Sequence, residues 1–467
     1  MARWTTFAFT GLCGVAVVGT LVYPTYPNYD SYYSLLWGDE ILHGHRPHFE
    51  GFRLPTEHPL AIVAGAVLDL FGGLADRLWI ILILGAFLAL VAGVYRLAAT
   101  AFTPLIGAVA AVLLLTRFDF AFLAVRGYID IPYLALVVWA VALEAGRPRR
   151  GLPVFALLVA AGLLRPEAWL LLGLYWLWMF PGASWRDRAI WAAVALIAPL
   201  GWCLLDGIVT GDPLFSLHHT SDSAEDLGRA RSLKQIPSAI PGFLSDIVKP
   251  PVMVAGVAGL VAAVLLAPRR AVWPAVLLAT GILTFVAIGV AGLSAIERYL
   301  VVAALAVLVF ASVSVGGWTL LEPSRVRTVW KVAATLLIVG GAVFTVLRLD
   351  LRTFDNELTY RGHAHRSLHR ILDTPAVRRG LRCGPLTLPN HKLVPDSRWL
   401  ADLPFERVRS RVKGPAQSRG VALVVLGRFA IFKLAWTNDY DPARVQVPPE
   451  GFALAARNDD YAAYVRC

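Results

Sequence analysis

The sequence predicts an all-α polytopic membrane protein of about eleven transmembrane helices, followed by a small α+β domain. Of its 467 residues, 57% are hydrophobic and only 16% are charged, whereas soluble domains carry about 25% charged residues. Apolar runs recur from residue 7 to residue 348, and each is long enough for a hydrocarbon core of about 30 Å. The remaining segment is polar. We therefore expect a transmembrane domain at 1–348 and a separate domain at 349–467.

Basic residues set the expected topology of these helices. The chain has a net charge of +11, which we attribute to the Arg and Lys that cytoplasmic loops of membrane proteins collect. A nucleic-acid partner is therefore not expected. An even number of crossings should separate one cytoplasmic patch from the next. The expected patches contain Arg3, Arg96, Arg147, Arg149, Arg150, Arg186, Arg188, Arg269, Arg270, Arg325, Arg327 and Lys331.

Parity identifies one apolar segment that should not cross the membrane. Three such segments, 7–23, 58–73 and 77–95, lie between Arg3 and Arg96, although the number of crossings should be even. Segment 58–73 is the shortest, at about 24 Å as a helix. It has Pro59 at its start and contains Asp69. We expect it to lie along the outer interface, and we interpret 7–23 as an uncleaved first helix.

The other crossings follow from the same rule. Segment 153–180 begins and ends beside cytoplasmic patches, so it should form a hairpin with arms of about 20 Å and the sequence Arg-Pro-Glu at its apex. A last helix then leaves the chain outside, which predicts a cytoplasmic N-terminus and an exoplasmic C-terminal domain in a multi-pass cell-membrane protein. The remaining expected helices cover 101–117, 131–146, 189–208, 251–267, 272–291, 299–319 and 329–347.

The polar C-terminal segment has the pattern of a small mixed domain. Short apolar runs at 421–426, 429–434 and 461–465 predict strands, and 361–380 predicts a helix. Cys383 and Cys467 both lie in this segment and could form a disulfide if it faces an oxidising compartment. Their spacing alone cannot establish the bond. Metal binding by these cysteines is disfavoured because neither belongs to a Cys-x-x-Cys pair.

This topology places many ionisable residues on one face of the membrane. Charges at membrane depth are costly and usually face a cavity or one another. A carboxylate there could take a proton from an alcohol, and arginines could hold an anionic phosphate leaving group. The residues on this face are Asp30, Asp39, Glu40, His58, Arg126, Asp130, Arg165, Glu167, His218, His219, Glu297 and Arg298.

Each candidate also has a purely structural interpretation. Asp30 could be the N-cap of a helix that begins YDSYYSLLWGDEIL, and the Gly-Asp-Glu sequence at 38–40 is expected on a solvated helix face. Arg165 and Glu167 could form a structural ion pair, and Arg298 could reach the interface as a snorkelling side chain. The four histidines of the first loop lack the spacing of a zinc site.

Several short motifs, taken in order, resemble one known class of enzyme. They are DSYYSLLWGDEILHGHRP at 30–47, TEHPL at 56–60, RGYIDIP at 126–132, LRPEAW at 164–169 and ERYL at 297–300. Their order and sidedness resemble the GT-C class of membrane glycosyltransferases, which use polyprenyl-phosphate sugars. The nearest pattern is that of the aminoarabinose transferase and protein O-mannosyltransferase type. The resemblance covers about 1–348 and includes the interfacial helix that parity requires.

The resemblance implies a role for each site residue. Asp30 would be the general base for an inverting transfer, and Asp130 would position the acceptor. The lipid phosphate would be bound by Arg126, Arg165 and Arg298, with Glu167 in the same substrate site and His58 at the cavity floor. Related enzymes often have two adjacent acids where this chain has Asp30 followed by Ser31. The chain has no convincing Asp-x-Asp pair, so neither a metal nor a cofactor is implied.

The expected function is therefore transfer of a sugar from a polyprenyl-phosphate donor in the lipid bilayer to an exoplasmic glycan, lipid or protein acceptor. Mannose and arabinose both remain open, so the activity could be that of a hexosyl- or a pentosyltransferase. A transporter or flippase of a lipid-linked glycan is one alternative, although the sequence has no repeated halves. A non-catalytic envelope scaffold is the other.

Overall fold

The structure is a computed structural model of the chain. It describes residues 2–23, 25–226, 236–293, 296–348, 351–412, 417–427, 430–435 and 446–467. The chain forms two compact units. Unit 1 comprises 1–19, 58–61 and 80–350, and unit 2 comprises 20–57, 62–79 and 351–467. The first loop thus belongs to the same unit as the C-terminal segment.

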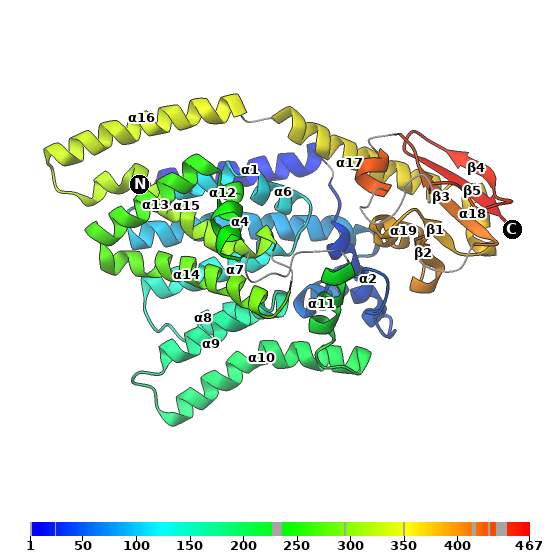
Figure 1. Ribbon diagram of the computed structural model, residues 1–467, viewed down its shortest axis with the longest axis horizontal. Helices are drawn as coiled ribbons and strands as arrows, with labels where there is room; N and C mark the ends of the chain where they lie inside the picture. The colour runs from blue at the N-terminus through cyan, green and yellow to red at the C-terminus, as the bar shows by residue number, and fades with distance from the viewer. Residues whose placement is uncertain are drawn as a thin grey trace. The chain divides into compact units, whose positions relative to one another are not determined.

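Unit 1 is helical throughout the part that the structure describes (Figure 1). Two of its helices, α1 (Ala2–Val22) and α4 (Ala75–Ala101), begin or end in unit 2. The others are α5 (Pro104–Leu115), α6 (Phe118–Val125), α7 (Asp130–Gly146), α8 (Leu152–Leu164), α9 (Ala168–Met179), α10 (Trp185–Thr210), α11 (Phe215–Asp226), α12 (Ile236–Val248), α13 (Pro250–Leu266), α14 (Pro268–Val290), η3 (Glu297–Leu300), α15 (Val301–Gly316), η4 (Gly317–Leu320) and α16 (Arg325–Arg348).

The core of unit 1 forms around α15. This helix is apolar on all sides and is buried along nearly its whole length, as expected for a helix without a polar face. It packs against α5, α13 and α14. Small residues permit this close packing, because a Cβ atom at Gly259 would lie 1.8 Å from the carbonyl oxygen of Phe310. Close backbone approach at small residues is the usual way in which membrane helices associate.

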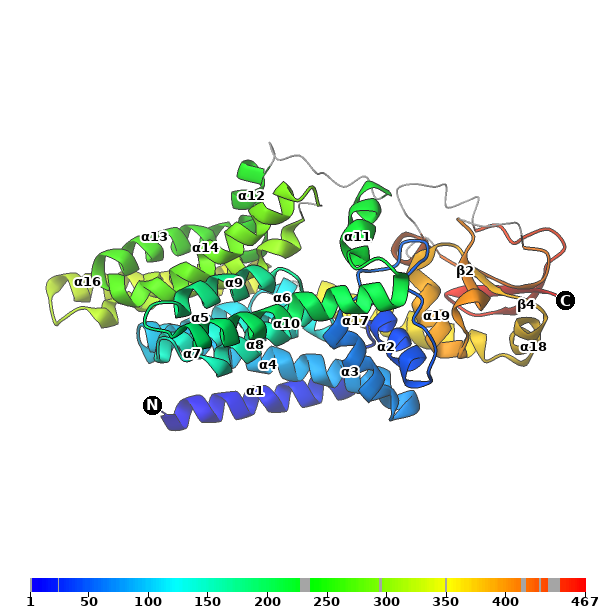
Figure 2. The same ribbon diagram turned by 90° about the horizontal axis from the view of Figure 1, so that it is seen from below.

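The predicted fold class is confirmed, since the chain is mostly helical and ends in a small sheet. Among the described residues, six helices are long and apolar enough to cross a membrane, and up to eight spans result if each of two bent helix pairs is one span. The bends are 65° between α5 and α6 and 110° between α12 and α13. The number of eleven crossings stays a prediction. The expected hairpin is present as α8 and α9, which pack against each other and against α10 (Figure 2).

Unit 2 contains a five-stranded sheet in the order β2-β1-β3-β5-β4. The three strands β2, β1 and β3 are parallel, whereas β5 runs antiparallel to both β3 and β4. The strands are β1 (Leu386–Leu388), β2 (Val408–Ser410), β3 (Gly420–Val425), β4 (Ala453–Arg457) and β5 (Tyr461–Arg466). The helices are α2 (Tyr29–Leu42), α3 (Pro59–Asp69), η1 (Gly72–Leu74), α17 (Leu351–Leu372), α18 (Pro375–Cys383), η5 (His391–Leu393), α19 (Val394–Ala401), η6 (Phe405–Arg407) and η7 (Ile431–Ala435). The first residues of α3 belong to unit 1.

Two of the three predicted strands are present, as β3 and β5. The strand predicted at 429–434 is wrong, because Ile431–Ala435 is helical. Its first residue lies outside the described residues. An apolar run of six residues does not distinguish a strand from a buried helical turn. Here Leu434 is buried in the domain core, and Lys433 lies 2.5 Å from Glu357 of α17. Both contacts favour the helical turn.

Cys383 and Cys467 are joined in a disulfide, with 5.3 Å between their Cα atoms. The bond ties the end of α18 to the residue after β5 and closes a loop across 84 residues of sequence. A loop of this size constrains the unfolded chain strongly. We expect Cys383→Ser to lower the stability of the C-terminal domain by about 2–4 kcal/mol, measured as thermal unfolding of the purified protein. Cys203→Ser, at a free cysteine, is the control and should have a much smaller effect.

Candidate functional site

The two helices of the hairpin in unit 1 are separated at a proline. Proline disfavours the helical conformation in the residue that precedes it. Arg165 precedes Pro166, and its backbone is extended at φ −149° and ψ 128°. Helix α8 therefore ends at Leu164, and α9 begins three residues after the arginine. The break directs the Arg165 side chain into a cluster of charged groups.

Arg165 lies between two carboxylates. Its Nη1 atom donates to Oδ1 of Asp130, the first residue of α7. Its Nη2 and Nε atoms lie 2.7 and 3.1 Å from Oε1 of Glu167. Asp130 is 1% exposed and Arg165 is 5% exposed, so the pair is shielded from water. We call Asp130, Arg165, Glu167 and Arg298 the charged cluster.

Two tyrosines enclose the guanidinium group of Arg165. Its Cζ atom is 5.6 Å from the ring centre of Tyr133 and 5.4 Å from that of Tyr299. Aromatic faces attract cations, and more strongly where water is excluded. The two rings therefore fix the orientation of the guanidinium group. Neither tyrosine was predicted from the sequence as a site residue. A usable signal was their spacing, since Tyr133 lies three residues after Asp130 and Tyr299 directly follows Arg298.

The carboxylates of the cluster retain acceptor capacity. Asp130 Oδ2 and Glu167 Oε2 are buried, and neither has a hydrogen-bond partner among the residues that the structure describes. A buried carboxylate oxygen without a partner is costly. Each of these oxygens can therefore accept a hydrogen bond from a hydroxyl group of a bound substrate.

Arg298 and His58 complete the surroundings of Asp130. Arg298 lies on η3, with its Nε atom 3.5 Å from Asp130 Oδ1 and about a third of its side chain exposed. Burial, together with the charges of Arg165 and Arg298, lowers the pKa of His58 to about 3, so its ring is neutral. The His58 ring packs edge-on against Trp202 at 5.7 Å. The structure thus brings four predicted site residues of unit 1 close to Asp130, namely His58, Arg165, Glu167 and Arg298.

Arg126 is also buried in unit 1, at the end of α6. A left-handed glycine, Gly127 at φ 71°, follows it and turns the chain toward α7. Asp206 is a further buried acid, which was not predicted from the sequence as a site residue. Its two oxygens each lie 2.9 Å from Ser216, one from the backbone nitrogen and one from Oγ. The Ser216 Oγ also accepts from Trp202 Nε1 at 2.8 Å, so Asp206 fixes the start of α11.

Asp30 lies in unit 2, in the first turn of α2. The expectation that it could be the N-cap is wrong, because Asn28 caps the helix and its Oδ1 accepts from the backbone nitrogens of Asp30 and Ser31 at 2.8 and 3.3 Å. Asparagine is among the best N-cap residues. The Asp30 carboxylate is half-buried and is not needed for capping. It also lies at the end of the helix dipole that favours a negative charge.

The C-terminal segment holds α2 through a buried ion pair. The expectation of a solvated face at 38–40 is wrong for Glu40, which is 7% exposed. Its Oε1 atom lies 2.8 Å from Nη2 of Arg398, a residue of α19 that is 2% exposed. The same carboxylate accepts from the backbone nitrogen of His48 at 3.0 Å, and the His48 ring bridges to Glu406 at 2.8 Å. Sequence periodicity could not reveal a partner 358 residues away.

We expect replacement of Arg398 alone to lower the free energy of unfolding more than replacement of both Arg398 and Glu40. Arg398→Met leaves the Glu40 carboxylate buried without its partner, which costs about 3–5 kcal/mol, whereas an apolar replacement of both residues is often close to neutral. Thermal unfolding of Arg398→Met and of the double variant Glu40→Leu with Arg398→Met tests this. Effects that simply add in the double variant would show that the two side chains do not interact.

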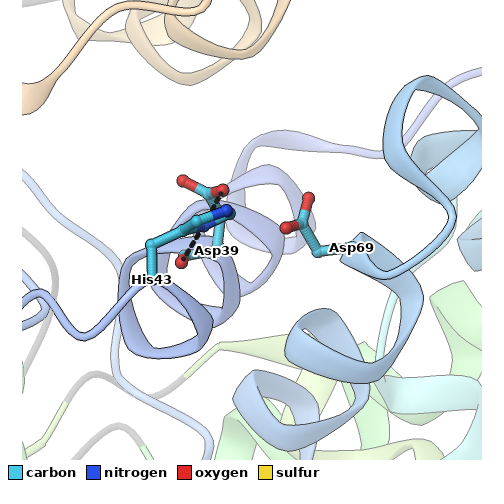
Figure 3. A group of neighbouring side chains, drawn as sticks. All are labelled: Asp39, His43 and Asp69. Carbon is cyan, nitrogen blue, oxygen red and sulfur yellow. Dashed lines mark hydrogen bonds and ion pairs between the residues drawn. The ribbon is translucent and has the colours of Figure 1, made fainter.

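A second group on unit 2 has the composition of a cation site. Figure 3 shows Asp39 of α2 and His43, the residue that follows this helix, beside Asp69 of α3. One ligand atom of each lies within 4.8 Å of the others. Hydrogen bonds to Asp39 raise the pKa of His43. The side chains of Asp39 and His43 are 42% and 59% exposed. Exposed groups of this kind are common without a bound ion, so we assign this group no role.

Comparison with known proteins identifies the fold. The chain is similar to ArnT from Cupriavidus metallidurans bound to undecaprenyl phosphate, with a TM-score of 0.58 and 16% identity over 99% of this chain and 98% of that one. With the apo form of ArnT the TM-score is 0.56 and the identity is 16%, over 98% of both chains. With an oligosaccharyltransferase from Archaeoglobus fulgidus the TM-score is 0.47 and the identity is 14%, over 82% of this chain and 60% of that one. No protein-family model and no curated protein sequence matches the chain.

The similarity to ArnT extends over both units and over nearly the full length of both chains. The protein therefore has the GT-C-like fold that its motifs resembled. Fold similarity at this level of identity does not specify an activity.

Proposed function

We propose that the protein is a membrane glycosyltransferase that moves a sugar from a polyprenyl-phosphate donor to an acceptor hydroxyl in the cell envelope. The observation that carries the proposal is the buried charged cluster around Asp130, on a fold shared with a protein solved in complex with undecaprenyl phosphate. Buried ionisable groups in membrane proteins mark functional sites by default. A scaffold would not need two buried carboxylate oxygens that lack partners among the described residues.

In this proposal Asp30 removes the proton from the acceptor hydroxyl. The oxygen then attacks the anomeric carbon on the face opposite the phosphate, the bond to the phosphate breaks, and the configuration inverts. Asp130 and Glu167 position the acceptor or the sugar through their remaining oxygens. The support for Asp30 as base is its motif, its place in the first turn of α2 and the fact that Asn28, not Asp30, caps this helix.

The arginines have different tasks. Arg165 already contacts two carboxylates, so we assign it to holding Asp130 and Glu167 in place. Arg298 is a third exposed and has a longer contact with Asp130. We therefore assign binding of the lipid phosphate to Arg298, with Arg126 as a second candidate. A guanidinium group suits this task because it can donate two parallel hydrogen bonds to phosphate oxygens.

We also propose that the N-terminus is cytoplasmic and that the C-terminal domain is exoplasmic. The support is the distribution of basic patches along unit 1. The disulfide between Cys383 and Cys467 agrees with this orientation, since disulfides persist in oxidising compartments.

Donor consumption tests the proposal. The purified full-length protein in detergent is incubated with a panel of radiolabelled polyprenyl-phosphate hexoses and pentoses, with an envelope extract as acceptor. We expect one donor to be consumed and free polyprenyl phosphate to be released. Movement of an intact lipid-linked sugar across proteoliposome membranes, without release of polyprenyl phosphate, would contradict the proposal and favour a transporter.

A further inference from the structure

The excess positive charge of the chain is concentrated in its C-terminal segment. Residues 351–467 contain 19 Lys and Arg but only 11 Asp and Glu, so eight of the eleven net charges lie in a quarter of the chain. Only three net charges remain for residues 1–350, so the expectation that cytoplasmic loops explain the net charge is wrong for most of it. A basic domain of this kind attracts anions. The positive charge of this segment therefore needs an explanation of its own.

Many basic side chains of this segment are engaged within the fold. Arg398 pairs with Glu40, and Arg378 pairs with Asp373. Arg407 donates to the carbonyl oxygens of Leu381 and Gly384 at the end of α18. Arg407 thus supplies hydrogen bonds to carbonyl oxygens at the C-terminal end of α18. The neighbouring arginines of α18 are therefore not required as a C-terminal cap.

Four exposed arginines lie on segments that the disulfide and the sheet bring together. One of them, Arg466, also donates from Nη1 to the carbonyl oxygen of Glu450 at 3.2 Å. Arg379 and Arg382 are exposed residues of α18, a helix that packs against β3 and β5. Arg466 directly precedes Cys467, and strand register pairs it with Gly420, the residue after Arg419. The disulfide brings Cys467 to Cys383, and a Cβ atom at Gly384 would lie 2.6 Å from the carbonyl oxygen of Arg419. We call Arg379, Arg382, Arg419 and Arg466 the arginine cluster.

We propose that the arginine cluster binds a polyanionic glycan chain that bears phosphate or carboxylate groups, and that this chain carries the acceptor hydroxyl. The inference rests on the proposed function for the identity of its ligand as the acceptor. Guanidinium groups match both anions in geometry. The cluster belongs to the same compact unit as Asp30. A polymer bound there would remain at high effective concentration for repeated reaction.

The composition of α18 favours a soluble polymer over a bilayer surface. A helix that docks on a membrane inserts large apolar side chains beside its basic residues. All of α18 is described, and it exposes no large apolar side chain, since Val377 and Leu381 are buried. The outer face of the helix instead consists mainly of arginine.

A binding assay that does not depend on turnover tests the proposal. The full-length protein in detergent is titrated with poly(glycerol phosphate), polygalacturonate or neutral dextran at two salt concentrations, and binding is measured by thermophoresis. The test variant is Arg382→Gln with Arg419→Gln. The control is Arg352→Gln with Arg457→Gln, which removes the same charge from exposed sites outside the cluster. Binding of undecaprenyl phosphate by each variant is measured in parallel.

We expect a polyanion but not dextran to bind, with lower affinity at high salt. The test variant should bind about tenfold more weakly, while the control should retain affinity within about twofold and both should bind undecaprenyl phosphate normally. Equal loss in the two variants would overturn the proposal, as would tighter binding to phosphatidylglycerol vesicles than to either polymer. Because binding needs no catalysis, failure of the donor assay would leave the binding result intact. Polymer binding that does not affect the rate of sugar transfer would refute only the assignment of the polymer as acceptor.

Discussion

Replacement of Asp30 by Asn should lower sugar transfer by about 10²–10⁴-fold, which is the usual contribution of a general base. The substitution keeps the size of the side chain but removes its ability to take a proton. The helix should form normally because Asn28, not Asp30, provides the N-cap. Binding of the polyprenyl-phosphate sugar should therefore be unchanged. The measurement is single-turnover donor consumption beside equilibrium binding of the same donor.

Asp39→Asn is the matched control for this experiment. Asp39 lies on the same helix, two turns and more beyond Asp30, and the chemical change is identical. We expect it to retain nearly full activity. Equal activity of wild type and Asp30→Asn would remove Asp30 from the mechanism. Loss of activity in both variants would indicate that α2 tolerates no change of charge, and the effect at Asp30 would then be structural.

The helices of unit 1 could be predicted because their signal is local. Hydrophobic length, basic loops and a proline after Arg165 act over short stretches of sequence, and the structure has α8 and α9 on either side of that residue. The interfacial character of α3 and the sidedness of the loops stay predictions. The motif containing Asp130 was also identified from local sequence.

The contacts that organise unit 2 could not be predicted in the same way. Glu40 was assigned to a solvated face because the helix pattern around it gives no sign of a partner, yet it pairs with Arg398 far along the chain. The helical turn at Ile431–Ala435 was likewise decided by contacts with α17 and not by its own composition. Long-range pairs of this kind depend on tertiary packing, which a single sequence does not display.

The second large effect is expected at Arg165. Arg165→Met leaves two carboxylates, Asp130 and Glu167, buried beside each other without the group that neutralises them. Breaking a buried pair costs about 3–5 kcal/mol, and here one substitution breaks two contacts. We expect a strongly destabilised protein that has also lost sugar transfer. Thermal unfolding in detergent, with and without undecaprenyl phosphate, measures the loss of stability.

Two further variants separate charge from shape at this position. Arg165→Lys retains the positive charge but not the planar guanidinium group that donates to both carboxylates. We expect it to lower the unfolding temperature less than Arg165→Met does, but to lower the rate of sugar transfer strongly. The double variant Arg165→Met with Asp130→Asn removes one of the stranded charges and should recover part of the stability. Recovery would establish that Arg165 acts chiefly by holding the carboxylates. If the double variant is as unstable as Arg165→Met alone, the arginine contributes through its packing between Tyr133 and Tyr299, and the assignment of Asp130 to substrate positioning loses its main support.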